Sequence, residues 1–522
     1  MRLSIDSFSY PDSRDPVLAG VEVGAGPGGC VLVAGGSGSG KTTLGLILAG
    51  VLPGQHRGSM TGTVELGGHV LAFPAAQASR VDHRQWGALA GYAGQDAAAQ
   101  LSTIASTVEA EIAFPLENAG LPRAEMTERV RETASALGLA ELLGRHPAEL
   151  SGGQQKLVAI AAAIARRPGY LVLDEPLAGL DLEARALVSN ALRTLVEDGM
   201  GVILLSQDLA GAGMVPDRVL LLDAGRAVFE GTPDAAAVQA AVLGLPVLGG
   251  AATAPARHTG SVLQPRTGQA NPVVAAEGLG FGYPTSQQRR WRRQVPAAPV
   301  VDGVSLTVAA GECVAVAGAN GSGKSTLLRL LTGLSAPQQG ELSLEQGAAH
   351  RGTGLGALLQ NPREQLFERT VWREVAAAVP RSVGDAGRAL RVDEALGRCG
   401  LLDAAGAHPY ELPASGQRLT ALAALLAQAP RFIALDEPTV SLDGPGLEIL
   451  GAAIEDEAAR GAAIVMVTHD LDFAYRTCAR LLVLSQGRPV ADGAFADVLA
   501  THFGAGAAFG VAAPAAWPRK QT

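Results

Sequence analysis

Two glycine-rich stretches of this chain share the pattern Gly-x-x-x-x-Gly-Lys-Ser/Thr, and they constrain its fold more than any other feature. The first covers residues 35–42 and the second covers residues 318–325. Each follows a short apolar run that predicts a buried parallel strand, and each precedes a leucine-rich stretch typical of a helix. In a strand–loop–helix, successive backbone N–H groups and the helix N-terminus surround a polyphosphate. Because both matches lie in this setting, chance resemblance in a glycine-rich chain is a poor explanation.

Within each loop, particular side chains are expected to contact the phosphates and a metal ion. The loop lysine should reach the outer phosphates of a bound nucleotide, and the hydroxyl that follows it should bind Mg²⁺. The predicted contacts are Gly35, Gly38, Gly40, Lys41, Thr42 and Thr43 in the first loop, and Gly318, Asn320, Gly321, Gly323, Lys324, Ser325 and Thr326 in the second.

Composition limits the remaining possibilities. At 522 residues the chain is too long for one core, and its 48% of apolar residues make several large cores easy to build. The net charge of −9 argues against nucleic acid as the main partner. No apolar run is long enough to predict a membrane span, and the N-terminus lacks the apolar core of an export signal. Cys30 and Cys313 occupy equivalent places in the two halves and are expected to be buried strand residues in a reducing cytosol.

The repeat extends well beyond the two loops. Residues 150–176 align without gaps on residues 412–438. Within each half, apolar runs alternate with alanine-rich helical stretches, which predicts an α/β fold with a parallel sheet covered on both faces. The expected organisation is a first domain over 1–245, a flexible linker over 246–271, a second domain over 272–510 and a tail over 511–522.

An acidic pair ends an apolar run in each half, Asp174-Glu175 in the first and Asp436-Glu437 in the second. At a strand end, the aspartate can hold Mg²⁺ through water. The glutamate can orient and polarise an attacking water, as phosphoryl transfer requires. An isolated Asp-Glu pair is usually a solvated turn, but both pairs follow a phosphate loop, which favours the catalytic interpretation.

A third tract, Ser151-Gly152-Gly153-Gln154, opens a predicted helix and offers N–H donors and a hydroxyl to an anion, with an ordinary helix cap as the alternative. With this tract, both halves of the chain resemble the ATP-binding cassette (ABC) ATPases over nearly their whole length. The resemblance implies two tandem P-loop ATPase domains, each with a mostly parallel sheet core, an antiparallel β-subdomain and a helical lobe. It also implies that ATP and Mg²⁺ are bound, and that the domains pair head to tail, so that each signature tract closes over the nucleotide on the other domain's loop.

The resemblance assigns further residues to the two nucleotide sites. They are Tyr10 and Tyr283 for stacking on adenine, Gln95 and Gln360 for linking Mg²⁺ and water to the helical lobe, His469 for contact with the γ-phosphate, and Asp181 and Asp443 for loops that cross the seam. The implied Mg²⁺ ligands are Thr42, Asp174 and Gln95 in the first half and Ser325, Asp436 and Gln360 in the second, and the implied catalytic residues are Glu175, Gln360, Glu437 and His469.

Two departures from the family pattern separate the halves. Gln207 replaces the histidine in the first half, and Pro413-Ala414-Ser415 replaces Ser-Gly-Gly in the second signature. Proline lacks an N–H to donate, and the added side chains crowd a place where glycine lets a phosphate approach. With head-to-tail pairing, both departures fall in the same nucleotide site, between the first phosphate loop and the second signature tract. This predicts a fast site on the second loop and a slow, nucleotide-holding site on the first; independent drift is the alternative.

The predicted helical lobe indicates what the ATPase drives. In both halves a second glutamine follows Gln95 or Gln360 by five residues, and a Thr-Val then opens an acidic amphipathic helix. These features resemble the ATPase subunits of energy-coupling factor (ECF) importers for vitamins or metal ions. The resemblance implies a peripheral location on the cytoplasmic face of the membrane, with an integral membrane T-type scaffold and a substrate-binding subunit as partners. Val108, Ile112 and Phe114 are candidates for a groove that receives a membrane-subunit helix, with ordinary packing in the lobe as the alternative.

Two other classes stay open. An ABC ATPase acting on ribosomes or nucleic acid is disfavoured by the negative charge and by the lack of a long charged linker or coiled-coil insertion. A sugar-type importer ATPase fits less well around Gln360. The one basic cluster, residues 289–293, fits contact with anionic lipid or a partner, or else a solvated hairpin tip.

Overall fold

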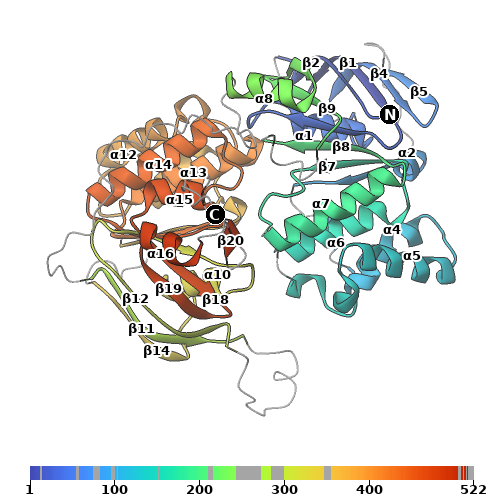
Figure 1. Cartoon of the computed structure of the whole chain (residues 1–522). Coiled ribbons are helices and arrows are strands. Elements are labelled where there is room, and N and C mark those ends of the chain that lie inside the picture. Colours follow the sequence, from blue (N-terminus) through green and yellow to red (C-terminus); the bar gives the residue numbers. More distant parts are fainter. Residues whose placement is uncertain are drawn as a thin grey trace. The chain divides into compact units, whose positions relative to one another are not determined.

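The computed structural model describes residues 1–11, 15–53, 58–73, 83–95, 100–102, 104–150, 152–180, 182–207, 209, 215–242, 272–283, 299–345, 354–503, 507–508, 511–512 and 514. The chain divides into two compact units, Met1–Ala252 and Thr253–Thr522, with closely similar orders of elements (Figure 1). The predicted linker and the basic cluster at 289–293 lie outside the described residues, as do Ser151 and Asp181.

Among its described residues, the first unit contains the following elements. The strands are β1 (Arg2–Ser9), β2 (Leu18–Gly24), β3 (Cys30–Ala34), β4 (Ser59–Leu66), β5 (His69–Phe73), β6 (Ala90–Ala93), β7 (Tyr170–Asp174), β8 (Gly201–Ser206), β9 (Arg218–Asp223) and β10 (Arg226–Gly231). The helices are α1 (Lys41–Leu48), α2 (His83–Leu89), α4 (Val108–Asn118), α5 (Arg123–Ala136), α6 (Gly152–Ala165), α7 (Leu182–Glu197) and α8 (Pro233–Val242).

The second unit repeats this series within the part of the chain that the structure describes. Its strands are β11 (Val274–Phe281), β12 (Val301–Val308), β13 (Cys313–Ala317), β14 (Gln339–Leu344), β15 (Leu355–Leu358), β16 (Phe432–Asp436), β17 (Ala463–Val467), β18 (Arg480–Ser485), β19 (Arg488–Ala494), β20 (Ala507–Ala508) and β21 (Val511–Ala512). Its helices are α10 (Lys324–Leu331), α11 (Val371–Ala378), α12 (Asp385–Arg398), α13 (Ala414–Gln428), α14 (Gly444–Ala459), α15 (Leu471–Thr477) and α16 (Phe495–His502).

Each unit is built on a mostly parallel sheet. The strand orders are β10-β9-β3-β8-β7-β6 and β15-β16-β17-β13-β18-β19, and only the hairpins β9–β10 and β18–β19 are antiparallel. Every residue of β3 and β13 is buried, as expected for a strand covered on both faces. The predicted α/β fold is confirmed, and the phosphate loops leave the carboxyl ends of these two inner strands.

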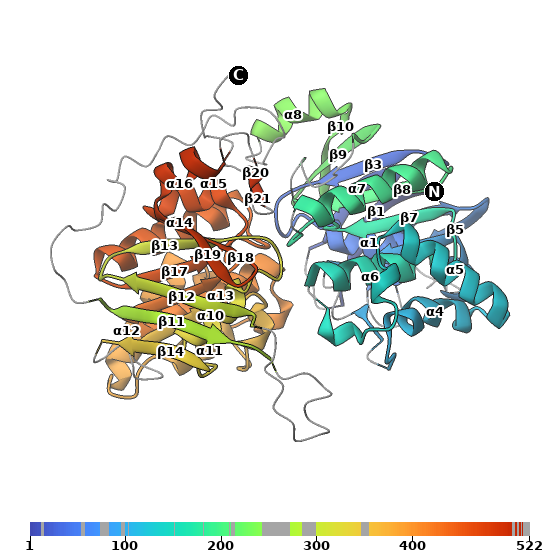
Figure 2. The same ribbon diagram turned by 60° about the horizontal axis from the view of Figure 1, so that its bottom comes forward.

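A smaller antiparallel sheet completes each core. Its orders are β2-β1-β4-β5 in the first unit and β12-β11-β14 in the second, where the three strands lie side by side in Figure 2. In β12, the apolar residues Val304, Leu306 and Val308 alternate with outward positions, the period of a half-buried strand. Their buried face packs on the parallel sheet beside the phosphate loop.

The helical lobes pack α4 and α5 on α6, and α11 and α12 on α13. Each lobe opens at a threonine cap, because Thr107 Oγ1 accepts from the Ala110 N–H at 3.1 Å and Thr370 Oγ1 from the Arg373 N–H at 3.2 Å. One expectation about this lobe is wrong. Val108 and Ile112 are fully buried in the core of the first unit, so they cannot line a surface groove.

All four cysteines are free and buried, as expected for Cys30 and Cys313, and Cys313 Sγ lies 2.8 Å from Cys478 Sγ.

Val511, placed in the predicted tail, is instead buried against the core of the second unit, and its strand β21 pairs with β20. The folded part of the second unit therefore continues past residue 510.

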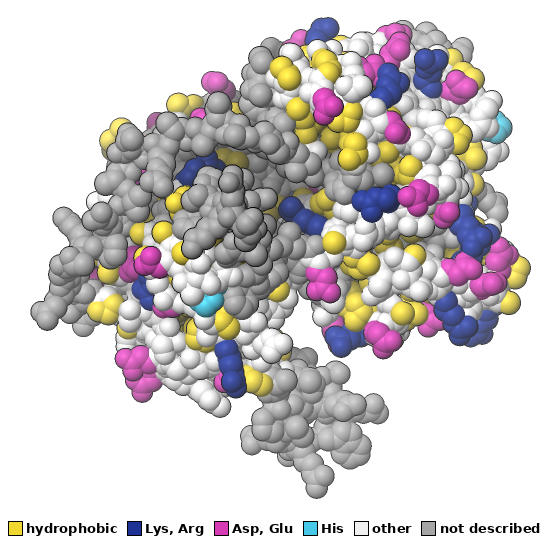
Figure 3. All heavy atoms as spheres, viewed as in Figure 1, with side chains coloured by type: hydrophobic (Ala, Val, Ile, Leu, Met, Phe, Trp, Pro, Cys, Tyr) yellow, Lys and Arg dark blue, Asp and Glu magenta, His cyan; other side chains and the backbone are white. Residues whose placement is uncertain are grey.

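None of the helices in the described ranges is both long and apolar enough to cross a membrane. On the face drawn in Figure 3, acidic and basic side chains are interspersed in small groups.

Candidate nucleotide-binding sites

Each phosphate loop curls around its own lysine. Lys41 Nζ donates to the carbonyl oxygens of Gly35 and Gly36, both at 2.7 Å, and Lys324 Nζ makes the equivalent bonds in the second loop at 2.7 and 2.9 Å. Both lysine side chains are buried at the start of a helix. An ammonium held by loop carbonyls at a helix N-terminus is well placed for the outer phosphates of a nucleotide.

Two positions in each loop require glycine. Gly40 and Gly323 both have φ of +98°, in the left-handed region that side chains rarely adopt, and each caps the following helix. A Cβ on Gly35 or Gly318 would lie 2.2 Å from a backbone carbonyl oxygen of the neighbouring strand. The loops can therefore pass this close to the sheet only with glycine at these places.

The predicted Mg²⁺ ligands come together in both halves. Thr42 Oγ1 donates to Asp174 Oδ2 at 2.7 Å, and Ser325 Oγ donates to Asp436 Oδ1 at 3.2 Å. Burial raises the pKa of both aspartates, although these hydroxyl bonds and the nearby loop lysines oppose the rise.

A hydroxyl beside a carboxylate is the hard oxygen donor set that Mg²⁺ takes in nucleotide sites, where substrate phosphates and water supply the remaining ligands. No group of three or more His, Cys, Asp or Glu side chains suited to a metal occurs among the described residues. The bound ion would neutralise charge on the phosphates.

The two predicted water-activating glutamates share a strained backbone. Glu175 has φ of +51° and Glu437 has φ of +46°, where a residue with a side chain is disfavoured by roughly 1–2 kcal/mol. Their N–H groups donate across the sheet edge to Leu205 O at 2.9 Å and Val467 O at 2.8 Å. Strain of this kind persists only where surrounding structure fixes it, and it is concentrated at functional sites.

In the second half, Glu437 lies in a hydrogen-bonded group that joins three loops. The His469 N–H donates to Glu437 Oε2 at 3.1 Å, and His469 Nε2 lies 3.2 Å from Glu437 Oε1 and 2.9 Å from Asn320 Oδ1. Burial raises the pKa of Glu437 to about 7, against the attraction of the Lys324 ammonium. The carboxylate is thus a stronger base than an exposed glutamate.

The first half has a different set of residues at the same place. Gln207 stands where the second half has His469, and Ser37 stands where it has Asn320. The Gln207 side chain is half-buried and makes no hydrogen bond within the described ranges. The arrangement that ties the histidine to the glutamate and the phosphate loop is therefore specific to the second half.

Tyr10 and Tyr283 lie beside their phosphate loops, half-exposed at 37% and 45%. Their hydroxyl groups contact Thr43 Oγ1 at 3.1 Å and Thr326 Oγ1 at 3.4 Å. A phenylalanine two residues earlier packs edge-on against each ring. An exposed ring face fixed at the loop is suited to stacking on a base.

Gln95 and Gln360 follow β6 and β15, whose carboxyl ends lie beside those of β7 and β16. The structure thus brings each glutamine to the same sheet edge as the acidic pair of its own half. Gln360 is exposed and Gln95 is half-buried.

The second glutamine of each pair has a role that the sequence did not suggest. Gln100 Oε1 accepts from the Gly94 N–H at 2.9 Å, and Gln365 Oε1 accepts from the Leu359 N–H at 2.8 Å. Each of these side chains thus fixes the backbone just before the first glutamine, which explains why the two glutamines are five residues apart in both halves.

The signature tracts start helices in register with the ungapped alignment. The helix α6 begins at Gly152, and α13 begins at Ala414 after Pro413. Gly153 is buried, Gln154 lies in the first turn of α6, and Ser151 is not described. Asp443, predicted at a seam-crossing loop, caps α14 by accepting from the Gly446 N–H at 3.0 Å.

Two buried cations beside the glutamates were missed in the sequence. Lys156 Nζ donates to the carbonyl oxygens of Glu175 and Ala178, and Arg418 Nη1 donates to the carbonyl of Glu437 at 3.2 Å. The signal was present, because both cations occupy the same place in an otherwise apolar stretch of the aligned signature helices.

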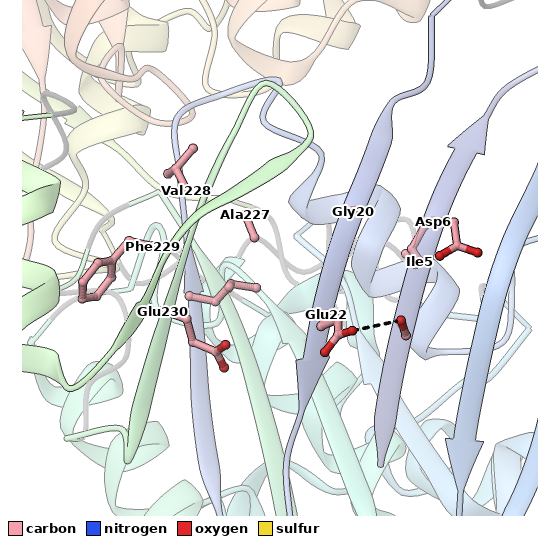
Figure 4. A pocket seen from close by; sticks show the side chains of 10 residues that line it. Ile5, Asp6, Gly20, Glu22, Ala227, Val228, Phe229 and Glu230 are labelled. Carbon is pink, nitrogen blue, oxygen red and sulfur yellow. Dashed lines mark hydrogen bonds between the residues drawn. The ribbon is translucent and has the colours of Figure 1, made fainter.

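A cavity of about 410 Å³ opens elsewhere in the first unit, between the antiparallel sheet and the hairpin β9–β10 (Figure 4). Ser4, Asp6 and Glu22 line one side and Glu230 the other, with Ser4 Oγ donating to Glu22 Oε1 at 3.3 Å. None of its lining residues is predicted to bind nucleotide.

Comparison with known proteins agrees with this geometry. A family model described as ABC transporter matches residues 18–178 and 301–440. A protein of Streptomyces coelicolor, provisionally named an ABC transporter ATP-binding protein, is 34% identical over 94% of this chain and 93% of its own length. A similarly named protein of Lactiplantibacillus plantarum is 30% identical over 94% and 91%. A solved structure titled RNase-L Inhibitor aligns with a TM-score of 0.60 over 95% of this chain and 92% of that one, at 20% identity, which supports the fold alone.

Proposed function

The chain belongs to the ABC transporter family, and we propose that it is the ATP-hydrolysing subunit of an ECF-type membrane importer for a vitamin or a metal ion. The observation that carries this proposal is an exposed apolar side chain in the same loop of both halves, just before the helical lobe. Ile104 is 82% exposed and Phe367 is 81% exposed. Two relatives that match nearly the whole chain are named as ABC transporter ATP-binding proteins.

The loop that carries each exposed side chain is held firmly. Glu111, 4% exposed, accepts from the Ser102 N–H at 2.7 Å and from Ser102 Oγ at 2.8 Å. Glu374, 6% exposed, accepts from the Phe367 and Glu368 N–H groups, both at 2.7 Å. Scattered exposed apolar residues need no explanation, but an exposed apolar residue in the same braced loop of each half is suited to a partner helix.

Other apolar side chains in the two lobes are also exposed. They are Phe114 in the first unit, and Trp372 and Tyr410 in the second, each more than a third exposed. We propose that the membrane T-type scaffold docks here, while a separate substrate-binding subunit selects the cargo. The ATPase would then work at the cytoplasmic face of the membrane.

We further propose that the two units pair head to tail and that the resulting ATP sites are unequal. The fast site combines the second phosphate loop, Glu437 and His469 with the signature of the first unit. The slow site combines the first loop, Glu175 and Gln207 with the altered signature at Pro413. Support comes from the hydrogen-bonded group around Glu437, in which His469 takes the place that Gln207 has in the first half.

At the fast site, the chemistry follows from the positions of the side chains. The Glu437 carboxylate, with its pKa raised by burial, accepts a proton from the attacking water. When ATP binds, the Nε2 atom of His469, which contacts Asn320 in this structure, would donate a hydrogen bond to the γ-phosphate instead, and Lys324 would stabilise the charge that develops on it. The ring of Tyr283 would stack on the adenine base of the nucleotide.

The transport proposal is tested by copurification from detergent-extracted membranes. We expect the chain to bring down a membrane subunit, and Phe367→Asp to weaken that recovery by at least about tenfold, because a carboxylate must then be desolvated against apolar partner groups. The matched control is Val238→Asp. Val238 is also well exposed, at 72%, but it belongs to α8 and not to the helical lobe of its unit.

Equal recovery of the membrane subunit with Phe367→Asp, Ile104→Asp and Val238→Asp would rule out this docking surface. Recovery of ribosomes in place of any membrane subunit would contradict the transport function itself.

A further inference from the structure

One charged side chain is buried more deeply than any other charged group near the second loop. Arg418, in the second turn of α13, is 2% exposed and is the largest fully buried side chain among the described residues. Its guanidinium lies between two loops. Nη1 donates to the carbonyl of Glu437 at 3.2 Å, and Nη2 donates to the carbonyl of Gln360 at 2.5 Å.

A cation this deep is costly to keep, and burial lowers the pKa of Arg418 to about 10. Its hydrogen-bond partners are backbone carbonyl oxygens, while the nearby Glu437 and Asp436 carboxylates attract its charge and offset part of the cost of burial. The planar fork of a guanidinium can donate in two directions at once, which makes it suited to joining two separate stretches of backbone.

The first unit offers a natural comparison. Lys156 occupies the equivalent position in α6 and is 6% exposed. Its ammonium donates to the carbonyl oxygens of Glu175 and Ala178, which both lie in the loop after β7. No hydrogen bond joins Lys156 to Gln95 within the described ranges. Lys156 therefore hydrogen-bonds to one loop, whereas Arg418 hydrogen-bonds to two.

The loop around Gln360 is fastened to the signature helix at a second point. Arg363 Nε donates to Gln417 Oε1 at 3.1 Å, and the Tyr410 hydroxyl donates to Leu366 O at 2.9 Å. Through Arg418, the same loop is also joined to the backbone of the proposed catalytic glutamate. These contacts give a continuous hydrogen-bonded connection from the Gln360 loop, which carries the proposed partner surface at its far end, to the backbone of Glu437.

We infer that Arg418 is a positioning residue, which fixes the Glu437 backbone relative to the Gln360 loop in the second half, and that Lys156 has no such function in the first half. This inference rests on the proposed function, because it takes Glu437 as the group that activates water. In this role Arg418 acts through its hydrogen bonds to the two carbonyl oxygens.

The test is a set of single variants of the full chain, assayed for steady-state ATP hydrolysis and for thermal unfolding. Arg418→Lys keeps the positive charge but cannot donate to both carbonyl oxygens in the geometry of the guanidinium. We expect kcat to fall about tenfold, with KM for ATP changed less than twofold and Tm nearly unchanged. Arg418→Gln should lower kcat further. The matched control is Lys156→Gln, which is expected to leave kcat within about twofold.

Amide hydrogen exchange distinguishes a positioning role of Arg418 from a purely structural one. In Arg418→Lys, amides of residues 359–366 should exchange faster, while the rest of the second unit keeps its protection. Unchanged kcat and unchanged exchange in Arg418→Lys would overturn the inference. So would a general loss of protection and a large fall in Tm, because Arg418 would then be a core residue only. Full activity in Glu437→Gln would instead overturn the proposed function.

Discussion

Replacing Glu437 with Gln is expected to lower kcat for ATP hydrolysis by at least about 100-fold, whereas Glu175→Gln should lower it by less than about threefold. A positioned general base contributes on the order of 10²–10⁴ in rate. Only Glu437 has a histidine bonded to it and to the phosphate loop, at 3.1 and 2.9 Å. Most turnover should therefore come from the second loop. The measurement is steady-state phosphate release at saturating ATP.

The two substitutions are well matched, because both glutamates have a positive φ and both lie at the end of an equivalent strand. Nucleotide binding should survive in each variant, which fluorescent ATP analogues can check. Losses of equal size from Glu437→Gln and Glu175→Gln would contradict the proposed asymmetry. A larger loss from Glu175→Gln would reverse the assignment of the two sites.

A second large effect is expected in the signature of the first unit. Gly152→Asp should lower kcat by at least about 100-fold, because the new carboxylate would face the γ-phosphate on the second loop. Two such charges about 4 Å apart repel by about 4 kcal/mol at an effective dielectric of 20. The equivalent change in the second unit, Ala414→Asp, should lower kcat by less than about threefold, since we propose that this signature serves the slow site.

Both substitutions fall at the first residue of an equivalent helix, α6 or α13, where an aspartate is well tolerated by the helix itself. Their effects on Tm should therefore be small and similar. If Ala414→Asp were the more damaging variant, each signature would act on the loop of its own unit or the fast site would be the first one.

Features set by a few neighbouring residues were predictable from the sequence. The runs 30–34 and 313–317 form fully buried parallel strands, because uninterrupted apolar residues before a glycine loop fit little else. The threonine caps of α4 and α11 likewise follow from local chemistry. The pairing of Thr42 with Asp174 needed only the rule that parallel strands end at one edge.

Features that depend on contacts between distant segments were not predictable in this way. Val108 and Ile112 are apolar residues of an amphipathic helix, and only the packing of α4 on α6 decides that they face the core. The role of Arg418 depends on two carbonyl groups far away in sequence. The positive φ of Glu437 also depends on a neighbouring strand, because Val467 O receives its N–H.

The most direct test of the account is a cross-linking measurement on the nucleotide-bound chain. Ser151→Cys is combined either with Asn320→Cys, in the second loop, or with Ser37→Cys, at the equivalent place of the first loop. The native cysteines are all buried, so a short thiol-reactive cross-linker should report the introduced pair. We predict an ATP-dependent link within one chain for the Ser151→Cys and Asn320→Cys pair. A link formed instead between positions 151 and 37 would contradict head-to-tail pairing and the unequal sites that depend on it.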